Sequence, residues 1–176
     1  DALGASITVA NAGNDFTGTV DFAGLGGLAN VTVLDTSALD LQALTLSGNL
    51  NATGAGITDS GVLDITGTTT LAAGAGNAVV LNEVGNDFGG AVSVTSGTSV
   101  TLVDATGGLD LGAINITADL NATATLGDIT NSGALTIGGN SVFTADAAGA
   151  SISVANAANA FTGTVGFAGA GGLANV

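Results

Sequence analysis

The sequence repeats itself on two length scales, and this feature constrains the fold more than any other. The short unit is a large apolar residue, a few small or polar residues and an alternating apolar run. Its clearest example is residues 88–104, Phe-Gly-Gly-Ala-Val-Ser-Val-Thr-Ser-Gly-Thr-Ser-Val-Thr-Leu-Val-Asp, which predicts two short strands joined by a turn that contains glycine. The unit starts again at Phe16, Leu39, Ile57, Leu109, Ile129 and Phe161. The chain is therefore a repeat protein.

A longer repeat of about 70 to 73 residues lies on top of the short one. Leu39-Asp-Leu41 returns as Leu109-Asp-Leu111, and residues 1–31 differ from residues 146–176 at only six positions. We divide the chain into a partial repeat 1–75, a repeat 76–148 and a partial repeat 149–176. All of 1–176 is expected to form one repetitive β-solenoid that belongs to a longer array, because each unit can bury its apolar face only against its neighbours.

The predicted fold is all-β, a right-handed parallel β-helix. Short strands alternate Val, Ile and Leu with Thr and Ser, Gly, Asn and Asp separate them, and no window has a helical period. A unit of about 20 residues without crossover helices fits one coil, so we expect about three coils per repeat of about 72 residues. The extra strands at 68–73 and 140–145 are expected to complete a coil or to form a lateral flap.

Composition excludes several classes of function. The 176 residues include 14 acidic side chains and no Lys, Arg, His or Cys, so no salt bridge between side chains can form and we expect a charged surface around a neutral core. Binding of nucleic acid through phosphate contacts requires Lys and Arg, and anionic membrane surfaces repel such a chain. No apolar run approaches the roughly 18 residues that a transmembrane helix needs.

Catalysis is not expected. Some enzymes on β-helices act on acidic polysaccharides, and they need either two suitably placed carboxyl groups or a base with cationic groups beside it. This chain has no Arg, Lys, His or Tyr, and Glu83 is its only glutamate. A carbohydrate-active enzyme is the function that the sequence favours least, and no catalytic residue is assigned.

Four recurring aspartates are the candidate site residues. Asp15 and Asp87 each precede a phenylalanine, and Asp35 and Asp104 recur between the long repeats. One interpretation is that their side chains satisfy backbone groups in turns. The other is a weak Ca²⁺ site, because carboxylate oxygens are calcium ligands. The Gly-Gly-x-Gly-x-Asp motif of calcium-binding β-rolls is absent, so no cofactor other than this possible Ca²⁺ is expected.

The recurring elements resemble those of a known family. Ile57-Thr-Asp-Ser-Gly-Val-Leu-Asp-Ile65, Leu39-Asp-Leu-Gln-Ala-Leu44, Asn86-Asp-Phe-Gly-Gly90 and Leu50-Asn-Ala-Thr53 are similar to the repeats of filamentous-haemagglutinin-like exoproteins of two-partner secretion and of autotransporter adhesins. The resemblance covers almost the whole chain. It implies a β-helix on the bacterial cell surface or outside the cell, used for adhesion, aggregation or contact with host or neighbouring cells.

The leading hypothesis is therefore a secreted structural protein that forms the β-helical shaft of an extracellular fibre or adhesin. Its open ends carry neither Pro nor Lys to block them, so end-to-end or lateral self-association into filaments is expected. The alternative is a calcium-dependent surface-layer or matrix protein, in which divalent ions join acidic rods. Neither hypothesis involves nucleic acid or insertion into a membrane.

Overall fold

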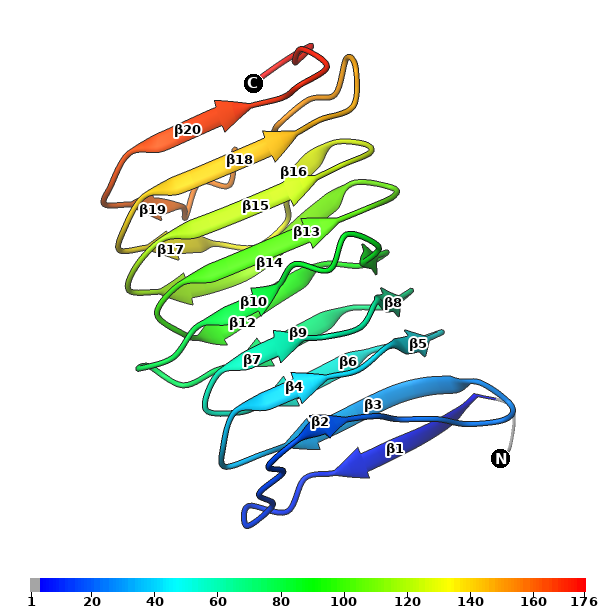
Figure 1. The fold of residues 1–176 in the computed structure, drawn as a ribbon. Helices are drawn as coiled ribbons and strands as arrows, with labels where there is room; N and C mark the ends of the chain where they lie inside the picture. Colours follow the sequence, from blue (N-terminus) through cyan, green and yellow to red (C-terminus); the bar gives the residue numbers. More distant parts are fainter. Residues whose placement is uncertain (1–3) are drawn as a thin grey trace.

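The chain forms a right-handed parallel β-helix, as the sequence predicts. A computed structural model describes residues 4–176, which contain strands and no helix and form about eight coils of about 21 residues each (Figure 1). At a spacing of about 4.8 Å per coil the shaft is about 38 Å long. The described residues contain no helix of the length and hydropathy that crossing a membrane requires.

Twenty short strands alternate with turns along the chain. They are β1 (Ala5–Val9), β2 (Thr19–Val20), β3 (Leu28–Leu34), β4 (Leu39–Leu41), β5 (Leu44–Leu46), β6 (Leu50–Thr53), β7 (Ile57–Asp59), β8 (Leu63–Ile65), β9 (Thr69–Ala72), β10 (Val79–Leu81), β11 (Asp87–Phe88), β12 (Val92–Ser96), β13 (Val100–Asp104), β14 (Leu109–Ile116), β15 (Leu120–Ala124), β16 (Ile129–Asn131), β17 (Leu135–Ile137), β18 (Ser141–Ala145), β19 (Ala160–Phe161) and β20 (Val165–Ala168).

The strands form two parallel sheets that wrap around one core. The eight-stranded sheet takes one strand from each coil, in the order β2-β4-β7-β10-β13-β15-β18-β20, and the twelve-stranded sheet takes the others. The predicted strands at 68–73 and 140–145 are β9 and β18, which lie inside the two sheets. They complete coils, so the alternative of a lateral flap is wrong.

Inward-facing residues stack into continuous apolar columns. One column follows the strand register of the eight-stranded sheet through Leu39, Ile57, Val79, Val100, Leu120 and Ser141, all of them buried. Because successive side chains of a strand point to opposite faces, the alternation in the sequence places every second residue in such a column. The core therefore runs without a break along the shaft.

A glycine in one recurring motif is required by close contact between coils. A Cβ atom on Gly61 would lie 2.2 Å from the backbone nitrogen of Ala43, and one on Gly133 would lie 2.2 Å from that of Ala113. These two glycines hold the same place in Ile-Thr-x-Ser-Gly-x-Leu-x-Ile in the two copies. Any larger residue would push adjacent backbones apart, which explains why this motif contains glycine.

The long repeat does not contain a whole number of coils. Leu39–Leu41 (β4) lies in the eight-stranded sheet, whereas its counterpart Leu109–Leu111 begins β14 in the twelve-stranded sheet. Leu50–Thr53 (β6) lies in the twelve-stranded sheet, whereas its counterpart in β15 lies in the eight-stranded sheet. A period of 70 residues at about 21 residues per coil gives about three and a third coils, which refines the expected number of about three. Each copy is therefore rotated by about one third of a turn around the shaft.

Two buried hydroxyl groups lie at corresponding positions of the two copies without a hydrogen-bond partner. They belong to Thr69 and Ser141, which face the core. We expect Thr69→Val to raise the free energy of unfolding by about 1 kcal/mol, because valine keeps the shape and removes an unpaired polar group. Urea denaturation measures this, with Thr70→Val on the outward face as the control, for which a change below about 0.5 kcal/mol is expected. Destabilisation by Thr69→Val would mean that the hydroxyl is hydrogen-bonded.

Candidate functional site

The turns of the solenoid hold buried polar side chains, so the expectation of a neutral core is wrong. Asp35, Asp59 and Asp104 are 3%, 8% and 0% exposed, and Asn86 is fully buried. A buried carboxylate is tolerated only where hydrogen bonds replace the water it loses. The contacts of these residues therefore define the candidate site.

Asn86 is the centre of the first group, the Asn86 cluster, which consists of Asn86, Asp59 and the Leu63 amide. The Asn86 side-chain oxygen accepts a hydrogen bond from the Leu63 N–H at 2.8 Å, and its amide nitrogen donates to the Asp59 carboxylate at 2.6 Å. Asp59 also accepts the N–H of Asn82 at 2.9 Å. Asn86 and Asn82 follow β10, whereas Asp59 and Leu63 belong to the coil before it. The cluster therefore joins two successive coils at their corner.

The same arrangement recurs one long repeat later, around Asn159. Its side-chain oxygen accepts the Leu135 N–H at 2.9 Å, and its amide nitrogen donates to the Asn131 side-chain oxygen at 2.8 Å. Asn131 takes the place of Asp59 in this copy. An uncharged amide thus serves as the acceptor as well as a carboxylate does, so the arrangement does not require a negative charge.

Asp35 and Asp104 have a second common role. The Asp35 carboxylate accepts the Phe16 N–H at 3.1 Å, and the Asp104 carboxylate accepts the Phe88 N–H at 2.8 Å. Asp35 also accepts the N–H of Ser37, two residues further on, at 3.2 Å. These contacts agree with the interpretation in which aspartate satisfies backbone groups of turns, and they show that some of those groups belong to the neighbouring coil.

The four aspartates predicted from the sequence come together as two pairs. Asp15 directly precedes Phe16, whose amide binds Asp35, and Asp87 directly precedes Phe88, whose amide binds Asp104. Asp15 is exposed and Asp87 half-buried, whereas Asp35 and Asp104 are buried. Among residues 4–176, no three His, Cys, Asp or Glu side chains are grouped so that they could hold a metal ion.

Asp104 is electrostatically distinct. Burial raises the pKa of the Asp104 carboxyl from 3.8 to about 7. The hydrogen bond from the Phe88 N–H opposes this rise, and the nearby charge of Asp87 adds to it. One of its two oxygens is buried without a hydrogen-bond partner. Near neutral pH this carboxyl therefore exchanges between its protonated and ionised forms.

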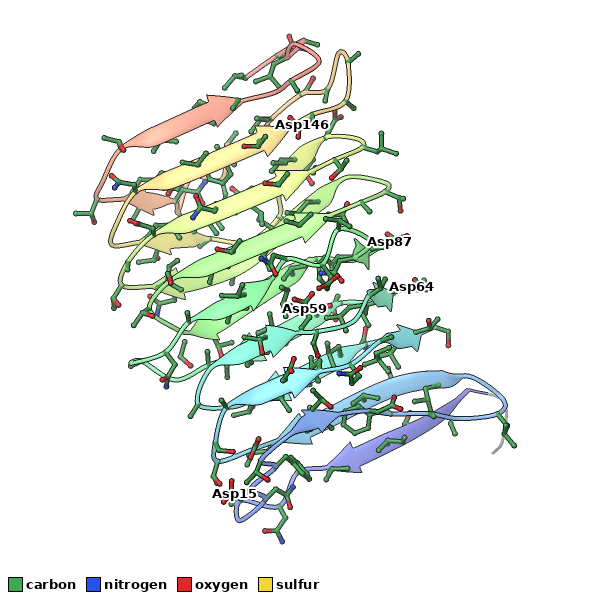
Figure 2. The ribbon with its side chains drawn as sticks, in the orientation of Figure 1. Asp15, Asp59, Asp64, Asp87 and Asp146 are labelled. Atoms are coloured by element: carbon green, nitrogen blue, oxygen red, sulfur yellow. The ribbon has the colours of Figure 1, made fainter. Side chains whose placement is uncertain are left out.

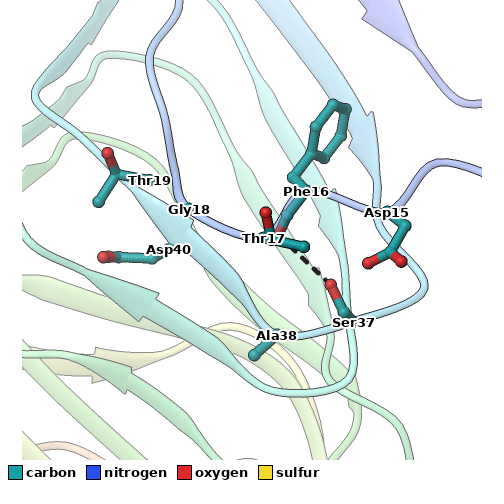
Figure 3. A pocket seen from close by; sticks show the side chains of 8 residues that line it. All are labelled: Asp15, Phe16, Thr17, Gly18, Thr19, Ser37, Ala38 and Asp40. Atoms are coloured by element: carbon teal, nitrogen blue, oxygen red, sulfur yellow. Dashed lines mark hydrogen bonds between the residues drawn. The ribbon is translucent and has the colours of Figure 1, made fainter.

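The surface around these residues has open grooves. One of about 440 Å³ is lined by Asp15, Phe16 and Asp40 among others (Figure 3), and a second of about 380 Å³ lies beside Asp110. Asp15 and Asp40 lie at opposite ends of the first groove in Figure 3, where the Ser37 hydroxyl donates to the Phe16 carbonyl oxygen. The chemistry available in these grooves is hydrogen bonding to carboxylate, hydroxyl and amide groups.

The sequence indicated Asn14-Asp15 and Asn86-Asp87 as recurring turn residues that satisfy backbone groups, but it did not indicate Asn159 or Asp59. The signal was the recurrence of Asn two residues before Phe at positions 14, 86 and 159, with Asp or Asn at 59 and 131. Asn14 occupies the same place but makes a different set of contacts, since its amide nitrogen donates to the carbonyl oxygens of Val9 and Leu34, each at 3.1 Å. The asparagine is kept in all three copies, whereas the aspartate beside it is lost as Ala160 in the last.

The fold and the repeated corner clusters define a repetitive β-solenoid protein, in which the recurring residues join one coil to the next. The family described as "Repeats of unknown function (DUF5649)" matches residues 28–95 and again residues 97–168, and the chain belongs to this family. The two matches start 69 residues apart, so one family unit corresponds to one long repeat. No curated protein and no solved structure matches the chain.

Proposed function

We propose that the chain is a segment of the β-helical shaft of an extracellular fibre or adhesin at the bacterial cell surface. The observation that carries the proposal is the stacking of about eight coils on one continuous, mainly apolar core, with the recurring polar residues used to join coils. A shaft of this kind supplies length and stiffness. The resemblance of the repeats to filamentous-haemagglutinin-like exoproteins supports the location and the adhesive role.

End-to-end association is part of this proposal. The last strand, β20, pairs only with β18, and its Val165 and Phe167 are 37% and 40% exposed. Residues 147–176 contain no acidic side chain, although the chain has 14 in all. A strand edge with free N–H and C=O groups, exposed apolar side chains and no charge adds further strands readily. We propose that in the 176-residue protein a second copy of this chain pairs with this edge, in the place that the next coil of a longer array would take.

Electron microscopy and sedimentation velocity of the 176-residue protein test the end-to-end step. We expect rods in multiples of about 38 Å, and a weight-average mass that rises with concentration. Val165→Asp places a carboxylate on the neutral edge and should leave single rods. Val142→Asp is the matched control, because Val142 is similarly exposed but lies in β18, whose two edges are both paired, and it should not affect assembly.

Two results would contradict the proposal. If the wild-type protein formed only isolated rods at millimolar concentration, end-to-end association would be ruled out. Assembly that EDTA abolishes and Ca²⁺ restores would favour the calcium-dependent surface-layer or matrix protein, for which the aspartate pairs Asp15–Asp35 and Asp87–Asp104 are the ligands to test first.

A further inference from the structure

The exposed large apolar side chains are concentrated in two places. Four of them, Leu25, Val62, Val84 and Leu126, are 95%, 41%, 83% and 54% exposed and lie in turns. The others belong to the last 35 residues: Val142, Val165, Phe167 and Val176. Leu25 and Val84 are almost fully exposed and gain little from the core, and Val62 and Leu126 leave about half of their surface exposed.

These four residues follow one corner of the shaft, and we call them the corner ridge. Each lies in the turn that leaves the eight-stranded sheet and enters the twelve-stranded sheet: between β2 and β3, β7 and β8, β10 and β11, and β15 and β16. In Figure 1 these turns lie along the same edge of the molecule. Five coil steps separate the first turn from the last, which gives a ridge about 24 Å long.

The two central members of the ridge, Val62 and Val84, lie in turns of adjacent coils. A Cβ atom on Gly85, the residue after Val84, would lie 2.9 Å from a methyl group of Val62. The turns that carry the two valines are therefore in contact. The ridge runs along the side of the shaft, so its role does not depend on how the ends of the shaft associate.

Carboxylates border the ridge along its length. Asp21, Asp64, Glu83 and Asp128 each lie within four residues of a ridge member, and Figure 2 shows Asp64 and Asp87 at the same edge of the shaft. The chain has no Lys or Arg. A second copy has no cation that could pair with these carboxylates, whereas a cationic partner would be attracted.

We propose that the corner ridge is a docking surface for a protein partner that presents an apolar strip bordered by Lys or Arg. The ridge side chains pack against the partner's apolar strip, and the flanking carboxylates pair with the partner's Lys or Arg side chains. The carboxylates would increase the rate of encounter and fix the orientation, while burial of the leucine and valine side chains would supply affinity.

An 18-residue synthetic helix with leucine on one face and lysine on the other is a suitable probe, because its length of about 27 Å matches the ridge. Its affinity for the 176-residue protein is measured by fluorescence anisotropy at 0.15 M salt. The ridge variant carries four substitutions, Leu25→Thr, Val62→Thr, Val84→Thr and Leu126→Thr. We expect it to bind the peptide at least tenfold more weakly while keeping the wild-type melting temperature, since all four side chains are exposed.

A matched pair of charge variants separates specific docking from general attraction to an acidic rod. Asp21→Asn, Glu83→Gln and Asp128→Asn remove three carboxylates beside the ridge and should weaken binding at least tenfold. Asp15→Asn, Asp40→Asn and Asp119→Asn remove three carboxylates elsewhere and should weaken it less than threefold. Equal losses in the two variants would overturn the proposal.

Three other results would also overturn it. Undiminished affinity of the ridge variant would mean that the apolar residues take no part in binding. Self-association of the wild-type protein without peptide that the ridge variant abolishes would identify a second copy as the occupant. Binding to phosphatidylcholine vesicles that is lost in the ridge variant, with no binding of the peptide, would identify a lipid surface.

Discussion

Replacement of Asp104 by asparagine is expected to stabilise the protein at pH 8 and to have little effect at pH 4. Asparagine keeps the oxygen that accepts the Phe88 N–H and removes the charge whose burial is unfavourable. A pKa raised from 3.8 to about 7 corresponds to a gain of up to about 4 kcal/mol in the free energy of unfolding at pH 8, at about 1.4 kcal/mol per pKa unit.

The sign follows from proton binding. Because the folded-state pKa of Asp104 lies above the unfolded-state value, the folded state holds this proton more tightly, and stability falls as pH rises from about 4 to about 7. Below this window the carboxyl is protonated in both states, and above it the charge is buried in the folded state. Urea denaturation of wild type and Asp104→Asn at half-unit intervals from pH 4 to pH 8 measures the difference directly.

Asp64→Asn is the control for this experiment, because it removes one carboxylate from an exposed position of β8. Because this side chain is exposed, the stability of the variant should differ from that of wild type by less than about 0.5 kcal/mol. If Asp104→Asn and wild type instead showed the same pH dependence, the Asp104 carboxyl would be ionised in the folded protein throughout, and the raised pKa would be wrong.

Asn86→Ala is expected to be strongly destabilising, by about 3 kcal/mol or more. The substitution leaves the Leu63 N–H without its acceptor and takes from the buried Asp59 carboxylate the amide that donates to it at 2.6 Å. Both groups are then left buried with fewer partners, which costs far more than the net gain from an ordinary hydrogen bond. The midpoint of guanidinium denaturation should fall accordingly.

Asp59→Asn is the informative companion to this variant. The copy of the cluster around Asn159 already uses Asn131 in place of aspartate, so an amide at position 59 should change stability by less than about 1 kcal/mol. A loss as large as that of Asn86→Ala would show that the charge of Asp59 is needed, and would contradict the equivalence of the two clusters.

The β-helix was predictable because its strands are visible in the sequence as an alternation. In residues 92–104, Val92, Val94, Val100 and Leu102 are buried, and the residues between them in β12 and β13 face outward. Such a pattern fixes the inner face of each strand from local sequence alone. Repetition of the pattern without helices then leaves stacking of coils as the way to bury that face.

The rotation of the long repeat was not predictable in the same way. Residues in register in successive coils are 18 apart for Leu39 and Ile57 and 24 apart for Ser141 and Val165, because the turns differ in length. Periodicity in the sequence reports that strands recur, but it does not report how many strands make one coil. That number depends on how the corners bend, which is a property of the stacked structure.

The role of the buried polar groups was predictable from the sequence in part. The recurrence of Asp35 and Asp104 indicated a role in turns, and both do accept backbone amides. The amide donor comes in each case from the preceding coil, 19 residues earlier for Asp35 and 16 residues earlier for Asp104. Local sequence does not show which residues an adjacent coil will cover, so Asn86 and Asp59 were not identified as a cluster.

Disulfide formation between pairs of engineered cysteines tests the stacking most directly, because the natural chain has no cysteine. Asn51 and Thr70 are register partners in adjacent coils, whereas Asn51 and Asn121 are sequence counterparts that lie in different sheets. We predict that Asn51→Cys with Thr70→Cys oxidises to an intramolecular disulfide in the folded protein, and that Asn51→Cys with Asn121→Cys does not. A disulfide in the second pair, or none in the first, would contradict the stacked and rotated solenoid.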